Sequence, residues 1–130
     1  MEKITVHIGK QNYKVDAKGA RQSLVIDEPV EVGGQDLGLS PKELLAVSLG
    51  SCTSITLKMY TNHKGWDLND VNIEVTLDWN KETLTTSFTR KIELIGNLDD
   101  TQRERLLKIA DSCPVHKILT NSTEIETKII

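Results

Sequence analysis

The sequence is poor in aromatic residues and in cysteine, and it has no long apolar run and no cluster of basic residues. Only 4% of its 130 residues are aromatic, 38% are apolar, and the formal net charge is −3. Binding to nucleic acid depends on neutralising phosphates, so a chain without a basic cluster is a poor candidate for it. No apolar stretch reaches the roughly 20 residues that cross a bilayer, and MEKITVHIGK does not resemble a signal peptide. We therefore expect one cytosolic domain, residues 1–130, without membrane or nucleic-acid partners.

The sequence also lacks the spacing that metal and phosphate sites require. It has two cysteines and three scattered histidines, with no closely spaced pair of the kind that binds zinc. The segment GGQDLG, residues 33–38, lacks the glycine spacing and the lysine of a phosphate-binding loop. The sequence thus predicts no bound metal or cofactor. Stable disulfides are rare in the cytosol, so the two cysteines are interpreted as a possible redox pair.

Alternating apolar and polar residues predict six strands, three of them close to the N-terminus. An irregular, glycine-containing loop follows the third strand. The fourth and fifth strands are expected to form a long hairpin with its turn at NKET. The predicted strands are residues 2–9, 11–19, 22–29, 68–80, 81–97 and 122–130. Together with the helices described next, this order predicts an α+β fold.

The clearest helix signals begin at Ser40. Ser40 is a good N-cap, Pro41 suits the first helical position, and Glu43 completes a capping box. The helix is expected to end near His63. Residues 44–57 are apolar on nearly every side, which predicts that a sheet or a partner chain buries this helix on most sides.

Two further helices are predicted near the C-terminus. Asp99 is the expected N-cap of a helix that ends near Ala110. Pro114 suits the first position of a short helix, for which either Ser112 or Cys113 is the cap.

Cys52 lies in the middle of the long predicted helix, and its position there favours a structural role. Helical spacing places Leu45, Leu49, Ile55 and Met59 on the same face, which is typical of a core stripe. A free cysteine often behaves as a small buried hydrophobic residue. Spacing alone therefore favours an inert Cys52, and a reactive one stays open.

Cys113 precedes Pro114 at a predicted helix start. Backbone N–H groups and the helix dipole stabilise a thiolate there and lower the pKa of the thiol. His116 lies within one turn, and when protonated it would strengthen this effect. A reactive thiol and an inert cap residue stay equally open.

Two segments around the cysteines resemble those of the OsmC/Ohr superfamily. They are DEPVEVGGQDLGLSPKELLAVSLGSCT, residues 27–53, and DSCPVHKIL, residues 111–119. The order of strands and helices is also similar, and the first segment is closer to the OsmC-like branch than to the organic hydroperoxide resistance proteins. The resemblance implies an OsmC-like α+β fold, in which a curved antiparallel sheet packs on a long buried central helix. It further implies an intertwined homodimer.

The same resemblance implies a thiol-dependent peroxidase that reduces organic hydroperoxides. Cys52 would be the attacking thiolate and would be oxidised to a sulfenic acid. Cys113 would then form an intramolecular disulfide with it, and an external dithiol such as dihydrolipoamide would reduce that disulfide.

An arginine held by a glutamate activates the thiol in the characterised peroxidases, and Arg21 is the candidate arginine here. Lys42 directly follows the proline, where those peroxidases carry the glutamate. Glu43, one residue later, is the candidate acid, and Glu28 is another. Glu43 is nine residues from Cys52, which places the two on opposite sides of an ideal helix.

A second interpretation follows from this shift of the glutamate by one residue. The protein would then be a non-catalytic or redox-sensing OsmC-like dimer that binds a small hydrophobic ligand between its subunits. A purely structural partner protein is a third interpretation that no specific feature favours.

Overall fold

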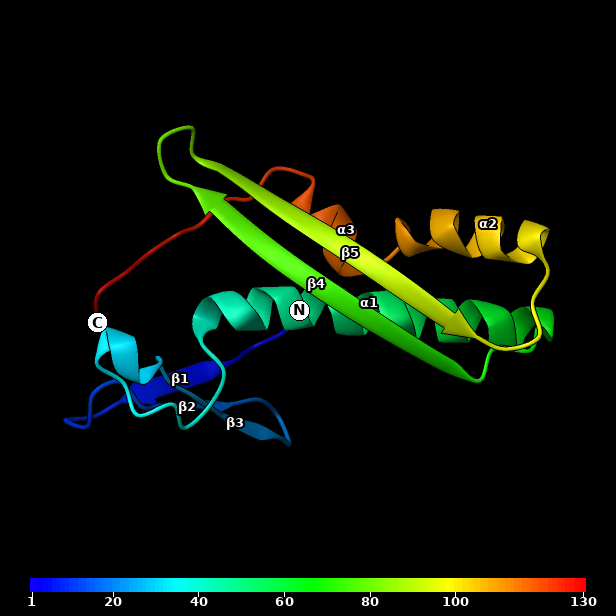
Figure 1. Ribbon diagram of the computed structural model, residues 1–130. Coiled ribbons are helices and arrows are strands. Elements are labelled where there is room, and N and C mark those ends of the chain that lie inside the picture. The colour runs from blue at the N-terminus through cyan, green and yellow to red at the C-terminus, as the bar shows by residue number, and fades with distance from the viewer. The chain divides into compact units, whose positions relative to one another are not determined.

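The computed structural model describes all 130 residues, which form two compact units, residues 1–45 and 46–130 (Figure 1). The elements of the first unit are β1 (Thr5–Ile8), β2 (Val15–Lys18), β3 (Ser23–Ile26) and the short 3₁₀ helix η1 (Val30–Val32). Helix α1 (Pro41–Lys64) begins in the first unit and continues into the second. The other elements of the second unit are β4 (Asp70–Asn80), β5 (Thr85–Ile95), α2 (Asp100–Ala110) and α3 (Pro114–Leu119). The predicted α+β class is confirmed.

The three N-terminal strands form one antiparallel sheet in the order β1-β2-β3. Val15 of β2 pairs with Ile8 on one side and with Ile26 on the other. The Gly19 N–H donates to the Gln22 carbonyl oxygen at 2.8 Å and closes the turn between β2 and β3. All three predicted strands are confirmed, each shorter than expected.

The loop after β3 is ordered around one buried carboxylate, that of Asp27. Its two oxygens accept four backbone N–H groups, from Tyr13 at 3.3 Å, Glu28 at 2.7 Å, Gln35 at 3.1 Å and Leu37 at 3.2 Å. Burial raises the pKa of Asp27, but these four donors outweigh it and hold the pKa below its ordinary value. The segment expected to be an irregular loop is therefore a fixed structure that includes η1.

Two glycines of this loop are required for close packing. A Cβ on Gly34 would lie 2.0 Å from the Glu28 carbonyl oxygen, and one on Gly38 would lie 2.1 Å from that of Val25. Both distances are shorter than any side chain could accommodate without moving the backbone. The loop therefore depends on glycine at these positions.

Helix α1 begins as the sequence predicts. The Glu43 N–H donates to Ser40 Oγ at 3.3 Å, and the Ser40 N–H donates to Glu43 Oε1 at 3.0 Å, which confirms the capping box. The helix runs one residue past the expected end and is followed by Gly65, whose φ is 70°. None of the helices combines the length and the apolar composition needed to span a lipid bilayer.

One face of α1 is buried, and it is not the face that the sequence indicated. The buried residues are Leu49, Thr53, Leu57 and Thr61, spaced four apart. Ile55 and Met59, expected in the core, are 54% and 67% exposed. The predicted core stripe is therefore wrong except at Leu49, and the single chain does not bury α1 on most sides. The reason is that the hairpin and α2 cover only one face of the helix.

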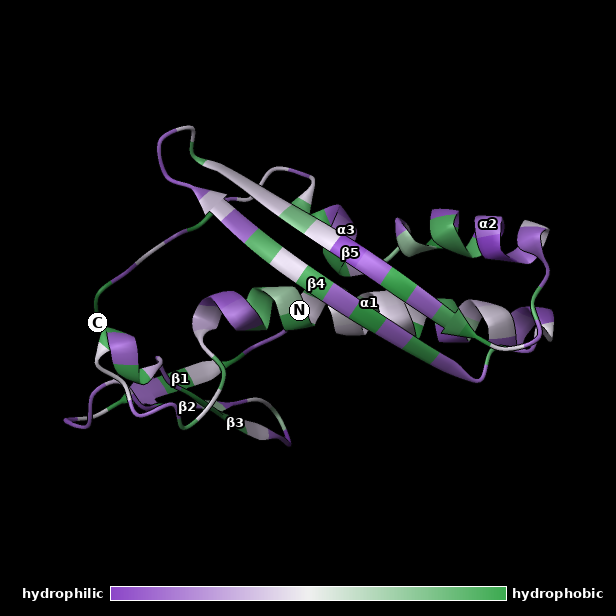
Figure 2. Ribbon diagram, viewed as in Figure 1, coloured by the Kyte–Doolittle hydropathy of each residue, from purple (hydrophilic) through white to green (hydrophobic).

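The predicted hairpin is confirmed, with its turn at residues 81–84 rather than 80–83. Partly buried residues alternate with exposed ones over residues 70–77 of β4 and 88–95 of β5, and the hydropathy colours alternate along both strands (Figure 2). Val75 pairs with Arg90, so a charged residue occupies a partly buried position of β5. The core beneath the hairpin contains Leu57, Leu68, Leu106 and Ala110.

Both C-terminal helices are confirmed. The Asp99 side chain accepts the Gln102 N–H at 2.7 Å, and the Gln102 side chain accepts the Asp99 N–H at 2.9 Å, so α2 begins with a capping box that the sequence did not predict. Cys113 is the N-cap of α3, which decides between the two predicted caps.

The last predicted strand, residues 122–130, is wrong. These residues form no regular secondary structure, and Ile125 and Ile129 are 85% and 99% exposed. A strand requires a neighbouring strand that accepts and donates its backbone hydrogen bonds. Neither sheet of this chain pairs with the segment. The alternation of apolar and polar residues was therefore not sufficient to form a strand.

Replacing Asp27 tests whether its carboxylate orders the loop. Asp27→Asn substitutes an N–H₂ for one accepting oxygen and leaves two of the donors without a partner. We expect hydrogen exchange at the Gln35 and Leu37 amides to accelerate by at least about tenfold.

The wild-type protein should show the same acceleration only in acid. Because the pKa of Asp27 is lowered on folding, its contribution is present above the ordinary aspartate range and is lost as the pH falls through the lowered value. Hydrogen-exchange mass spectrometry at neutral and acidic pH makes both measurements. Equal exchange in both proteins at neutral pH would contradict this account of the loop.

Candidate functional site

The two cysteines, far apart in the sequence, meet inside the C-terminal unit. Cys52 lies in the middle of α1 and is partly buried, while Cys113 caps α3 and is fully buried. Both are free thiols, and they lie close enough together for each to shift the pKa of the other. The fold thus brings together the two predicted sulfur atoms.

The local environment of Cys113 favours its thiolate. Burial raises the pKa of this thiol, but hydrogen bonds from the Cys52 thiol, the His116 backbone N–H, the Thr53 side chain and the Val115 backbone N–H lower it below the ordinary value. The His116 N–H lies 3.4 Å from Cys113 Sγ. The lowering expected from the helix start is therefore found, and the structure identifies its donors.

Cys52 has the opposite shift. Burial raises the pKa of its thiol, and the hydrogen bond and negative charge of Cys113 raise it further. The Val115 backbone N–H and the Thr56 side chain compensate only in part. When the pair loses one proton, the negative charge therefore resides on Cys113, and Cys52 donates the hydrogen bond between them.

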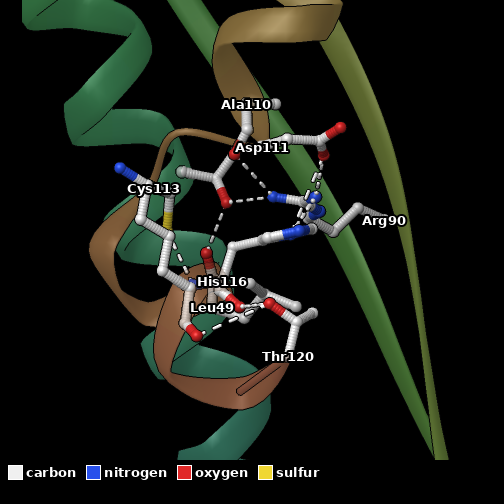
Figure 3. Close-up of polar contacts among 9 residues, drawn as sticks. Leu49, Arg90, Ala110, Asp111, Cys113, His116 and Thr120 are labelled. Atoms are coloured by element: carbon white, nitrogen blue, oxygen red, sulfur yellow. Dashed lines mark hydrogen bonds and ion pairs between the residues drawn. The ribbon is translucent and has the colours of Figure 1, made fainter.

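A guanidinium group lies beside this pair, and the sequence analysis missed it. Arg90 Nη1 donates to Thr53 Oγ1 and to the Ala110 carbonyl oxygen, each at 3.0 Å. Arg90 Nη2 lies 2.9 Å from Asp111 Oδ1 and 2.9 Å from His116 Nδ1 (Figure 3). A guanidinium can only donate, so His116 Nδ1 accepts and the ring proton is on Nε2. The available signal was the charge of Arg90 at a position that alternates with apolar residues along β5.

The other predicted site residues, Arg21 and Glu43, belong to the N-terminal unit. Arg21 is exposed in the turn between β2 and β3. The Glu43 carboxylate accepts from the Ser40 backbone, and hydrogen bonds with the Ser40 backbone and side chain lower its pKa. No group of three or more His, Cys, Asp or Glu side chains is arranged to hold a metal ion.

Comparison with known proteins identifies related sequences and folds. Residues 33–128 match the family described as OsmC-like protein. No curated protein matches the chain. A solved structure from Psychrobacter arcticus, named for osmotic stress induction and a detoxification response, is 25% identical, with a TM-score of 0.76 over 90% of this chain and 85% of that one.

Two other solved structures have the same fold at lower identity. An OsmC-like protein from Mycoplasma pneumoniae is 17% identical, with a TM-score of 0.79 over 92% of this chain and 86% of that one. The organic hydroperoxide resistance protein OsmC from Legionella pneumophila is 22% identical, with a TM-score of 0.66 over 92% and 89% of the two chains.

The opposite pKa shifts can be tested by titrating the thiolates. We expect Cys52→Ser, which retains Cys113, to titrate at lower pH than Cys113→Ser, which retains Cys52. The Cys113 thiolate keeps its backbone donors, whereas the Cys52 thiolate keeps the burial that opposes it. Thiolate absorbance near 240 nm, followed from pH 5 to pH 11 or so, measures each midpoint. The reverse order of midpoints would contradict the assignment of the charge to Cys113.

Proposed function

The chain belongs to the OsmC-like protein family, and we propose that it is a thiol-dependent peroxidase that reduces organic hydroperoxides with Cys52 and Cys113. The observation that carries this proposal is that the two free thiols lie near each other, close enough for each to shift the pKa of the other. A disulfide requires its two Cα atoms within about 7 Å of each other, and thiols that already interact are well placed for it.

Cys52 is the proposed attacking thiol because it is the more accessible of the two. Cys113 is 0% exposed, whereas Cys52 is only partly buried, so a hydroperoxide reaches Cys52 first. The resting charge on Cys113 is compatible with this role. As Cys52 attacks, its proton can pass to the neighbouring Cys113, so Cys113 serves as the base.

The proposed reaction has three balanced steps. The Cys52 sulfur attacks one peroxide oxygen, the O–O bond breaks, and a sulfenic acid and an alcohol form once the alkoxide takes up a proton. Cys113 Sγ then attacks the Cys52 sulfur, the S–O bond breaks, and water leaves as the disulfide forms. An external dithiol reduces that disulfide to two thiols and becomes a disulfide itself.

The apolar residues of α1 support a preference for organic hydroperoxides over hydrogen peroxide. Leu49 and Ile55 lie within one turn of Cys52, and an alkyl group gains free energy when it leaves water for such surroundings. Hydrogen peroxide has no alkyl group and obtains no such gain.

In the proposed reaction, Arg21 and Glu43 activate the attacking thiol. Arg21 would stabilise the Cys52 thiolate during attack, and Glu43 would orient Arg21. Capping of α1 occupies Glu43 Oε1, and a carboxylate has a second oxygen that can accept from a guanidinium.

We also propose that the protein acts as a homodimer. Ile55 and Met59 form an exposed apolar strip on α1, at 54% and 67% exposure. Residues 122–130 have strand-like alternation and no strand to pair with. A second copy could cover the apolar strip and supply a pairing edge, and exposed apolar patches often mark interfaces.

One observation favours a second candidate function, a non-catalytic or redox-sensing dimer that binds a small hydrophobic ligand. The raised pKa of Cys52 reduces the fraction of attacking thiolate. Such a protein would oxidise its cysteine pair slowly and show no steady turnover.

Peroxidase activity is the direct test of the first candidate. The purified protein should consume cumene hydroperoxide with dihydrolipoamide as reductant, and hydrogen peroxide more slowly. Cys52→Ser should reduce consumption to the rate of the protein-free mixture, because it removes the attacking sulfur. Cys113→Ser should accumulate a sulfenic acid that dimedone traps at Cys52.

Controls separate the two candidate functions. Oxidised wild-type protein should contain a Cys52–Cys113 disulfide in its peptide map, which shows that the thiols are competent. A protein that forms this disulfide without turning over either peroxide would instead support the redox-sensing dimer.

Met59→Glu tests the proposed dimer. A glutamate in an apolar interface would be buried without a partner, so the variant should be monomeric at concentrations where the wild type is dimeric. Leu107→Glu on α2 is a matched control, because Leu107 is 66% exposed and Met59 is 67% exposed. Sedimentation equilibrium measures the mass of each. A monomeric wild type, or a dimeric Met59→Glu variant, would refute this interface.

A further inference from the structure

We infer that Arg90 is a positioning residue that holds Cys113 against Cys52 so that their disulfide can close. The inference deepens the proposed function and rests on it for the step in which the disulfide forms. It assigns to β5 a role in the chemistry of two cysteines that lie on helices.

The first observation is the place of Arg90 in the fold. Its side chain is only 13% exposed and lies on the partly buried face of β5. Four groups from three parts of the chain surround the guanidinium: Thr53 in α1, Ala110 and Asp111 at the end of α2, and His116 in α3. The Asp111 carboxylate compensates its charge.

The second observation is that one of these partners follows Cys52 directly in the sequence and the others lie on both sides of Cys113. Thr53 directly follows Cys52, whereas Ala110, Asp111 and His116 flank Cys113. Figure 3 shows Arg90 directed toward Ala110, Asp111 and His116. The rigid, planar guanidinium of Arg90 therefore connects the residues on both sides of Cys113 with Thr53, which follows Cys52.

Thr53 is the residue of α1 through which Arg90 contacts the long helix. Its hydroxyl is fully buried, donates to the Leu49 carbonyl oxygen at 2.6 Å and accepts from Arg90. The same side chain lies close enough to Cys113 to help lower the pKa of that thiol. A hydroxyl has one proton and two lone pairs, so Arg90 can keep donating to Thr53 whichever acceptor the proton selects.

The remaining backbone contacts of the Cys113 segment are local. The amides of Asp111, Ser112 and Cys113 donate to the carbonyls of Lys108, Ile109 and Ala110, all within the end of α2. These bonds shape the turn but do not themselves reach α1. Arg90 adds a connection to α1 through Thr53, beside the interactions that Cys113 and Val115 make with Cys52 and Thr53.

The geometry matters because disulfide formation depends on precise placement of the sulfurs. Cys113 must attack the sulfenic sulfur of Cys52 before another reagent does, and bridged Cα atoms lie within a narrow range of separations. Attack within one molecule gains from a high effective concentration, which falls when the reacting groups move apart. Lysine could not replace Arg90, because an ammonium cannot make the paired planar contacts of a guanidinium.

Arg90→Gln tests the inference, with Arg103→Gln as a matched control. Arg103 also donates to three acceptors in the same unit, the carbonyl oxygens of Leu94, Gly96 and Leu98, but these lie at the end of β5 and in the loop between β5 and α2. Both variants lose an arginine with several hydrogen bonds, and only Arg90→Gln loses contacts beside the cysteines.

The measurement is the equilibrium of the Cys52–Cys113 disulfide with oxidised and reduced dithiothreitol, which gives the effective concentration of the two thiols. We expect Arg90→Gln to lower it by at least about tenfold and Arg103→Gln to leave it near the wild-type value. After equal oxidation, dimedone should trap a larger share of the Cys52 sulfenic acid in Arg90→Gln than in the wild type, because disulfide closure competes with trapping less well. A merely structural role would not change this partition.

Several outcomes would overturn the inference. One is a folded Arg90→Gln protein with the wild-type effective concentration, and another is an equal fall in Arg103→Gln. If Arg90→Gln does not fold, Thr53→Val removes one acceptor at nearly constant shape, and it should lower the effective concentration by a smaller factor. No change in a folded Thr53→Val protein would also overturn the inference.

The experiment keeps the two proposals distinguishable because the disulfide equilibrium requires no peroxide. An equilibrium that depends on Arg90, in a wild type that does not consume hydroperoxide, would support the positioning role and refute the peroxidase. Hydroperoxide turnover with an equilibrium independent of Arg90 would refute the positioning role alone.

Discussion

The burial of one face of α1 is the constraint on which the rest of the C-terminal unit depends. Leu49 and Leu57 on that face are buried, and Leu57 packs with Leu106 of α2 in the core, where both are 0% exposed. Burying a leucine is worth about 1.5 to 3 kcal/mol, so this packing fixes the rotation of α1 about its own axis. Because successive residues of a helix differ by about 100°, that rotation also fixes the direction in which Cys52 faces.

The same face carries two threonines, and Thr53 connects packing with chemistry. A hydroxyl in a core must be hydrogen-bonded to avoid a desolvation cost. Thr53 satisfies this by donating to its own helix and by accepting from Arg90, which also binds residues on both sides of Cys113. A polar group in the core therefore connects the long helix to the segment that holds the second cysteine.

The two thiols form one electrostatic unit. Burial disfavours both thiolates. The Cys52 thiol, the backbone at the start of α3 and the Thr53 side chain together lower the pKa of Cys113, so Cys113 carries the charge. Cys113 ionises more readily, but Cys52 is the more accessible of the two sulfurs because it is less buried. In the proposed reaction these differences are complementary, since the accessible sulfur meets the peroxide and the buried one takes up the proton and later closes the disulfide.

The sequence alone predicted most of the secondary structure because those signals are local. The capping box at Ser40 and Glu43, the alternation in β4 and β5, and the cap at Cys113 depend on residues that are neighbours in the sequence. The family resemblance, which rests on the two cysteine segments, is confirmed by the match over residues 33–128. The lowered pKa of Cys113 was also predictable, since the start of its own helix supplies backbone donors.

Tertiary structure decided which face of α1 is buried, that residues 122–130 find no strand partner in this chain, and that Arg90 lies beside Cys113. Each of these depends on contacts between residues far apart in the sequence, and no local pattern of apolar or charged residues specifies such contacts.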